Sequence, residues 1–270
     1  PLANPEHETD LITLASAVAK QRNGTLVAVH IEKVPDQTAL ESAREKLDLS
    51  ASHDLLEQAR GDAETFDVPI ETHTVLSHQS FEGIFDAAKT YDADLTVMGW
   101  GPDSHGSPGR AESAIDELAA SLPCDFLVAK NRGLDFSRIL LPTVGGPDSE
   151  LSAEVARALR EHAGADVRLL NVVEGAADRE AGEAFLADWA EENGLGEATQ
   201  VVDDSGDVES AIAAECGNHT LLLIGATSQG LLSRLVRNAL HYDIVNETET
   251  SMILAERATD RSILQRLFGR

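Results

Sequence analysis

The sequence predicts an α/β protein built as two tandem domains, each a five-stranded parallel sheet with helices on both faces. Three observations predict this class: the chain has 270 residues, it repeats itself, and short apolar runs alternate with segments of helical periodicity. A shift of 126 residues places Gly99 on Gly225, and near the start a shift of 141 places Ala15 on Ala156. Strands that alternate with helices favour a parallel sheet that is covered on both sides.

The second copy gives the order of elements most clearly. We expect strands at residues 138–141, 167–173, 199–202, 221–224 and 252–255, because these runs are short and apolar. We expect helices at residues 149–161, 181–192, 208–215 and 231–245, where apolar residues recur at spacings of three and four. Residues 130–138 are the natural linker. The predicted domains are therefore residues 1–131 and 138–256, followed by a tail at 257–270.

The first copy departs from this order at its start. Pro142 follows the apolar run Ile139, Leu140 and Leu141, whereas its partner Pro1 has nothing before it. A central strand of the first domain is thus mostly missing from the sequence. We expect the polypeptide to continue upstream of Pro1.

The charge excludes some classes of partner. Acidic residues outnumber basic ones by 47 to 21, and the net charge is −26. This charge makes nonspecific binding to nucleic acid unfavourable, and the acidic bias is typical of a halophilic organism, whose salt screens it. No apolar run has the ~18 residues of a membrane-spanning helix, so we expect a soluble chain.

The residues that commonly bind metals or form disulfides carry no such pattern. Cys124 and Cys216 lie in different segments without metal-ligand spacing, which favours buried structural thiols. The nine histidines are scattered, and His73 with His78 is the nearest to a cluster. The sequence therefore predicts no metal site.

Three blocks of the second copy carry a family resemblance: "LLPTVGGPDSE" at 140–150, "IGATSQG" at 224–230 and "MILAE" at 252–256. With their counterparts in the first copy, they resemble a tandem universal stress protein over essentially the whole chain. The resemblance implies two Rossmann-like domains of the adenine nucleotide alpha hydrolase-like type.

Four further blocks narrow the resemblance: "PLANPEHE" at 1–8, "VPDQTAL" at 34–40, "MGWG" at 98–101 and "LPCDFLVAK" at 122–130. They are similar to the cytoplasmic C-terminal regions of amino-acid permeases of the cationic, amino-acid-polyamine-organocation type, here from a halophilic archaeon. This implies a transmembrane transporter portion in the same polypeptide and a place on the cytoplasmic face of the cell membrane. The final strands could pair the two domains or two copies through their edges.

The family's nucleotide-binding members place an Asp after the first strand and G-x2-G-x9-G-[ST] after the fourth. The first copy has Ala3 at the Asp position, and its motif reads Gly99, Pro102, Glu112 and Ser113. Pro102 removes an N–H donor and Glu112 places a negative charge near the phosphates. The first domain should therefore not bind ATP.

The residues of the second copy suit nucleotide binding better than those of the first. The degenerate site that the resemblance implies comprises Val144, Gly145, Gly225, Ser228, Gly230, Arg234, Arg237 and Asn238. A turn before a helix N-terminus offers N–H groups to an anion, so ATP or AMP is the cofactor expected if this site is filled. The alternative, that Arg234 and Arg237 form a solvated helix face, stays open.

The function expected from these features is a non-catalytic regulatory, ligand-sensing module of an amino-acid transporter. One alternative is a freestanding nucleotide-binding stress protein that uses the second site. Another is an adenylating enzyme, because "VGGPDS" at 144–149 resembles the SGGxDS loop of ATP pyrophosphatases. The tail at 257–270 carries four Arg and one apolar face, which suits either a membrane surface or packing on its own domain.

Overall fold

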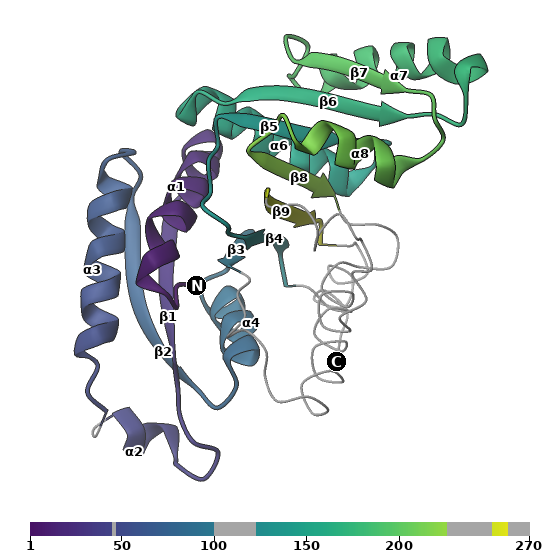
Figure 1. Cartoon of the computed structure of the whole chain (residues 1–270). Helices are drawn as coiled ribbons and strands as arrows, with labels where there is room; N and C mark the ends of the chain where they lie inside the picture. Colours follow the sequence, from purple (N-terminus) through teal and green to yellow (C-terminus); the bar gives the residue numbers. More distant parts are fainter. Residues whose placement is uncertain (45–46, 100–122, 226–249, 259–270) are drawn as a thin grey trace. The chain divides into compact units, whose positions relative to one another are not determined.

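The structure is a computed structural model, and it describes residues 1–44, 47–99, 123–225 and 250–258 (Figure 1). These residues form two compact units. Unit 1 contains Pro1–Gly99 together with residues 123–126 and 258, and unit 2 contains the described residues of Leu127–Arg257. Residues 127–130, which precede the predicted linker, belong to unit 2 by their contacts. The domain boundary predicted at residue 131 stays a prediction.

Unit 2 contains the five predicted parallel strands. They are β5 (Arg138–Pro142), β6 (Asp166–Val172), β7 (Thr199–Asp203), β8 (Leu221–Gly225) and β9 (Ser251–Glu256). The order across the sheet is β9-β8-β5-β6-β7, so β5 is central and pairs with β6 and β8. Each strand agrees with its predicted range to within one residue at either end. The prediction of a parallel α/β fold is confirmed.

Three helices of unit 2 follow the predicted pattern. They are α6 (Pro147–Ala163), α7 (Arg179–Glu192) and α8 (Val208–Cys216), with a short 3-10 turn η2 (Ala176–Asp178) before α7. Pro147 opens α6 and Gly164 ends it in the left-handed conformation, with φ of 70°. Figure 1 shows α6 behind the sheet and α8 in front of it. The helix predicted at 231–245 lies outside the described residues.

The core of unit 2 explains why its strands are continuously apolar. Ile139, Leu140 and Leu141 of β5 are all fully buried, although neighbouring residues of a strand point to opposite faces. Such burial requires cover on both faces, which α6 and α8 provide. β5 therefore forms the centre of this unit.

Unit 1 also alternates helices and strands. Its elements are α1 (Pro5–Arg22), β1 (Leu26–Lys33), α2 (Leu40–Arg44), α3 (Ser50–Glu64), β2 (Ile70–Ser77), α4 (Ser80–Thr90), β3 (Leu95–Gly99) and the start of β4 (Asp125–Lys130). β1 and β2 pair in parallel as a two-stranded sheet, and β3 lies beside β4. Among the described residues of this half, these two pairs are the strand pairings that form.

Helices pack on both groups of strands in unit 1. α3 and α4 contact β1 and β2, while α1 contacts α3, β3 and β1. The rings of Phe85 in α4 and Phe126 in β4 stack with centroids 5.2 Å apart, and both side chains are buried. This aromatic pair fixes α4 against the start of β4.

Both cysteines are buried free thiols, as predicted. Burial, aided by the neighbouring Glu215 carboxylate, raises the pKa of the Cys216 thiol to about 11. Because the thiolate is the reactive form, this side chain is chemically protected.

Candidate functional site

The loop that follows β5 has the backbone conformation of a tight glycine turn. Gly145 and Gly146 have φ of 81° and 88°, in the left-handed region that favours glycine. The Gly145 N–H donates to Thr143 Oγ1 at 3.0 Å, which holds the turn. Val144, at the position where nucleotide binders of the family carry Asp, is 78% exposed. An apolar side chain therefore faces solvent at the expected adenine position.

The N-terminus of α6 lies directly after this turn. Its first turn carries Asp148 and Glu150, whose negative charges favour the positive end of the helix dipole. Asp148 Oδ1 also accepts a hydrogen bond from the backbone N–H of Arg257 at 2.7 Å. A phosphate at this helix end would meet two carboxylates, so the site is electrostatically poor for a triphosphate.

Gly225 ends β8 where the first turn of α6 crosses it. A Cβ at this position would lie 2.7 Å from the carbonyl carbon of Asp148 and 2.8 Å from the backbone nitrogen of Ser149. Real Cβ atoms do not approach backbone this closely, so packing alone requires glycine here. At the equivalent Gly99 the nearest atom is Leu11 Cδ1 at 3.4 Å.

The structure brings together part of the predicted nucleotide site. Val144 and Gly145 follow β5, and Gly225 ends β8, so all three lie at the carboxyl ends of neighbouring strands. This is where ligands bind in parallel α/β sheets. The other predicted members lie outside the described residues: Ser228, Gly230, Arg234, Arg237 and Asn238. In the first copy, Pro102, Glu112 and Ser113 also lie outside them.

Two residues next to the turn were not predicted from the sequence. Asn171 of β6 is buried, and its Nδ2 donates to the Thr143 carbonyl at 2.8 Å. Phe185 of α7 lies 3.5 Å from where a Cβ on Gly145 would stand. The sequence could have indicated Asn171, because it is an amide side chain between apolar residues at the end of a predicted strand.

Acidic side chains cap the carboxyl end of β7. The hydroxyl and N–H of Ser205 hold the pKa of Asp203 below its ordinary value, and the N–H of Ser210 lowers that of Asp207. Arg179 Nε lies 2.9 Å from Asp204 Oδ2. These exposed groups stabilise the loop and the start of α8.

The two histidines nearest to a cluster in the sequence make local contacts. His73 stacks on Tyr91 with ring centroids 4.4 Å apart, and His78 Nδ1 lies 3.2 Å from the Val34 carbonyl oxygen. Across the part of the chain that the structure describes, no three His, Cys, Asp or Glu side chains form a group suited to a metal ion. In that same part, no helix is both long and apolar enough to cross a bilayer.

The first part of the chain matches a known family model. Residues 1–130 match the model of the universal stress protein family. The described fold is that of a universal-stress-type α/β protein, with Rossmann-like parallel strands and helices. The predicted duplication of this domain is not covered by the match and stays a prediction.

Solved structures share the fold over nearly the whole chain. A universal stress protein from Archaeoglobus fulgidus has a TM-score of 0.57 at 14% identity, covering 96% of this chain and 94% of that one. A putative universal stress protein from Pseudomonas aeruginosa has a TM-score of 0.58 at 18% identity, with coverages of 95% and 91%. The cytoplasmic domain of a prokaryotic cation chloride cotransporter has a TM-score of 0.63 at 11% identity, with coverages of 96% and 94%.

One curated relative is a transport protein. The Na(+)/H(+) antiporter NhaS5 of Synechocystis is 27% identical over 179 residues, which is 64% of this chain. The aligned part is 25% of the antiporter, so the chain spans about a quarter of that relative.

Proposed function

We propose that this chain is a non-catalytic regulatory, ligand-sensing module of a membrane transporter. The observation that carries the proposal is the similarity to two transport proteins, an antiporter and a cotransporter. The chain aligns in sequence with part of an antiporter. Its structure matches the cytoplasmic domain of a cotransporter over 96% of this chain. The transmembrane portion would belong to the same polypeptide, and the module would lie on the cytoplasmic face of the membrane.

The finer identity of the transporter rests on sequence motifs. The blocks at 1–8, 34–40, 98–101 and 122–130 favour an amino-acid permease of the cationic type. The net charge of −26 favours a halophilic source, in which salt screens the repulsion. Pairing through the strand segments 126–129 and 252–255 would join the two halves as a pseudo-dimer, or two copies as a homodimer. The tail at 257–270 would contact a membrane surface or its own domain.

The contacts around α6 suggest how a ligand could be sensed. The turn after β5 leads into α6, and Asp148 in the first turn accepts the Arg257 N–H just after β9. A ligand at the carboxyl end of β5 that moved this turn would strain the Asp148–Arg257 bond. Such a ligand can shift the module between states only by as much as it binds one state better.

The regulatory role is tested in proteoliposomes that contain the full polypeptide. Asp148→Asn keeps the size of the side chain but weakens the hydrogen bond from Arg257, so we expect amino-acid uptake to change at least twofold at equal protein content. Asp188→Asn, an equal charge change at an exposed position of α7, is the matched control and should leave uptake unchanged. Equal uptake by both variants and by a polypeptide without this module would refute the regulatory role.

A freestanding nucleotide-binding stress protein is the second candidate, with ATP or AMP in the second half. The left-handed Gly145 and Gly146 ahead of α6 support it, because residues without a Cβ let an anion approach the start of a helix closely. Exposed Val144 and the acidic first turn of α6 oppose it. An adenylating enzyme is disfavoured, since Pro147 and Asp148 act as a helix start and as the partner of the Arg257 N–H.

Nucleotide titration separates these candidates. We expect ATP, AMP and cyclic dinucleotides in molar KCl to leave the melting temperature of the wild-type chain unchanged if the site is degenerate for nucleotides. Val144→Asp restores the acidic residue that the family resemblance implies for adenine, and Val144→Asn is its uncharged control. Saturable ATP binding by the wild type would favour the stress-protein candidate, and release of pyrophosphate would favour the enzyme.

A further inference from the structure

Unit 1 has a longer connection after its first strand than unit 2. β1 ends at Lys33 and α3 begins at Ser50, whereas residues 173–178 alone separate β6 from α7 in unit 2. The longer connection carries α2, which contacts β2. Figure 1 shows α2 near the carboxyl end of β1. Unit 1 therefore has an additional wall beside its two-stranded sheet.

The helix α2 encloses a cavity together with β2 and α4. The volume of this cavity is about 490 Å³. Pockets that bind small ligands have volumes of roughly 300–1,000 Å³. The cavity is lined by Leu40 and Glu41 of α2, by residues 74–76 of β2, and by Asp86, Ala87, Thr90 and Tyr91 of α4.

Val75 gives the cavity an apolar floor. Thr74 Oγ1 lies 2.6 Å from Ser52 Oγ of α3, so the Thr74 side chain points toward α3. Neighbouring residues of a strand point to opposite faces, so Val75 points toward α4. Ser77 shares this face with Val75, and its Cβ lies 2.9 Å from where a Cβ on Gly83 of α4 would stand.

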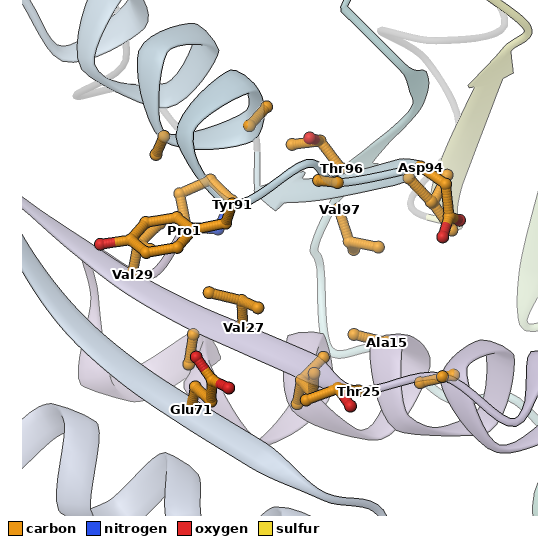
Figure 2. Close-up of a pocket in the computed structure, with 18 of the residues that line it drawn as sticks. Pro1, Ala15, Thr25, Val27, Val29, Glu71, Tyr91, Asp94, Thr96 and Val97 are labelled. Carbon is orange, nitrogen blue, oxygen red and sulfur yellow. The ribbon is translucent and has the colours of Figure 1, made fainter.

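Tyr91 is the aromatic side chain of the cavity, and its ring is held in place. The ring stacks on His73 with centroids 4.4 Å apart. Tyr91 also lines a neighbouring cavity of unit 1, and Figure 2 shows its hydroxyl pointing away from Thr96 and Val97. A fixed aromatic ring attracts a cation that approaches its face.

The charged side chains of the cavity are acidic. Glu41 lies on the α2 side and Asp86 on the α4 side, and no Lys, Arg or His is among the described residues that line the cavity. Leu40, next to Glu41, is apolar and 37% exposed. A ligand that suits these walls carries positive charge toward both helices and an apolar part between them.

We propose that this cavity binds an aliphatic diamine. One ammonium group would lie at Glu41 and the other at Asp86, and the methylene chain would lie on Leu40 and Val75. Charged hydrogen bonds to carboxylates are strong, and contact with apolar side chains removes the methylene groups from water. This inference goes beyond the regulatory role proposed above and does not depend on it.

Two other classes of cation suit the cavity less well. A free amino acid carries a carboxylate, which would meet two acidic side chains and no cationic one here. A metal ion would make no use of the apolar floor. Within the described part of the chain, no group of three His, Cys, Asp or Glu side chains is suited to a metal ion.

Calorimetric titration of the full 270-residue chain tests the class of ligand. The titration is done in 1 M KCl, because this salt screens the general attraction of cations to a net charge of −26. The probes are 1,4-diaminobutane, 1,5-diaminopentane, pentylamine and lysine. We expect saturable binding of a diamine at one site. Pentylamine lacks one ammonium group and lysine adds a carboxylate, so each should bind at least about tenfold more weakly.

Two variants without charge at single positions test the location of the site. Glu41→Gln and Asp86→Asn each keep the size of an exposed side chain, so the chain should stay folded, and each should weaken diamine binding at least about tenfold. Glu64→Gln, an equal charge change at an exposed position of α3 outside the cavity lining, is the matched control and should leave binding unchanged. Circular dichroism checks the fold of all three variants.

Three results would overturn the proposal. The first is the absence of saturable binding of either diamine to the wild-type chain. The second is an equal affinity of the three variants for the diamine, because the attraction would then be general. The third is binding of lysine as tight as that of 1,5-diaminopentane, because the cavity would then accept a carboxylate.

Discussion

Gly225→Ala tests whether this glycine serves packing or a ligand. The new Cβ would lie 2.7 Å from the Asp148 carbonyl carbon, 2.8 Å from the Ser149 nitrogen and 3.0 Å from the Asp148 oxygen. All three are backbone atoms of α6, so no side chain can rotate to relieve the contact. β8 or α6 must therefore shift.

The expected cost follows from overpacking. Forcing one extra carbon into a packed region costs about 1–3 kcal/mol, and rigid backbone neighbours favour the upper part of this range. For a unit of this size, each kcal/mol lowers the melting temperature by roughly 2–4 °C. We expect Gly225→Ala to lower it by about 5–10 °C.

Gly217→Ala is the matched control. Gly217 follows α8 with a helical φ of −59°, and a Cβ there would meet nothing within 4 Å. This substitution should be neutral or stabilise by about 0.4–1 kcal/mol, because alanine restricts the unfolded chain.

Thermal unfolding by circular dichroism, with urea unfolding as a second probe, measures both variants. Hydrogen exchange at the Arg257 N–H reports whether α6 has moved, since that group donates to Asp148. If Gly225→Ala unfolds within about 1 °C of Gly217→Ala, the packing argument is wrong. If it instead leaves stability unchanged and removes a nucleotide-induced stabilisation, Gly225 serves a ligand.

Four other predictions concern the whole chain and single side chains. Raising KCl from 0.1 to 2 M should raise the melting temperature by several degrees, because the screening length falls from about 10 Å to below 3 Å around a net charge of −26; a flat or falling curve would contradict this. Asn171→Ala should cost about 1–3 kcal/mol in urea unfolding, because it leaves the buried Thr143 carbonyl without its amide partner. Asp207→Ala should destabilise at pH 6 and not at pH 2: the folded pKa is depressed by Ser210, so the contribution is present above the ordinary value of 3.8 and is lost as pH falls through the folded pKa. Cys216 should react with iodoacetamide at pH 8 at a rate that follows unfolding, because burial raises its pKa to about 11, and fast labelling of folded protein would refute this.

The sequence alone determined the parallel sheet of unit 2. Its central strand contains the run Ile139–Leu141, in which every residue is apolar, and burial on both faces explains such a run. The helix predicted at 149–161 was also correct in type, although α6 extends two residues further at each end, from Pro147 to Ala163. The internal shifts of 126 and 141 residues also predicted which strands correspond.

Only the tertiary structure decided what Gly225 does. The motif assigned Gly225 to a phosphate, whereas its need for glycine arises from α6, whose first turn is about 75 residues away in sequence and crosses it in space. Periodicity reports which side chains of one segment share a face, but it does not report the distance between backbones of different segments, and that distance decides why residue 225 is glycine.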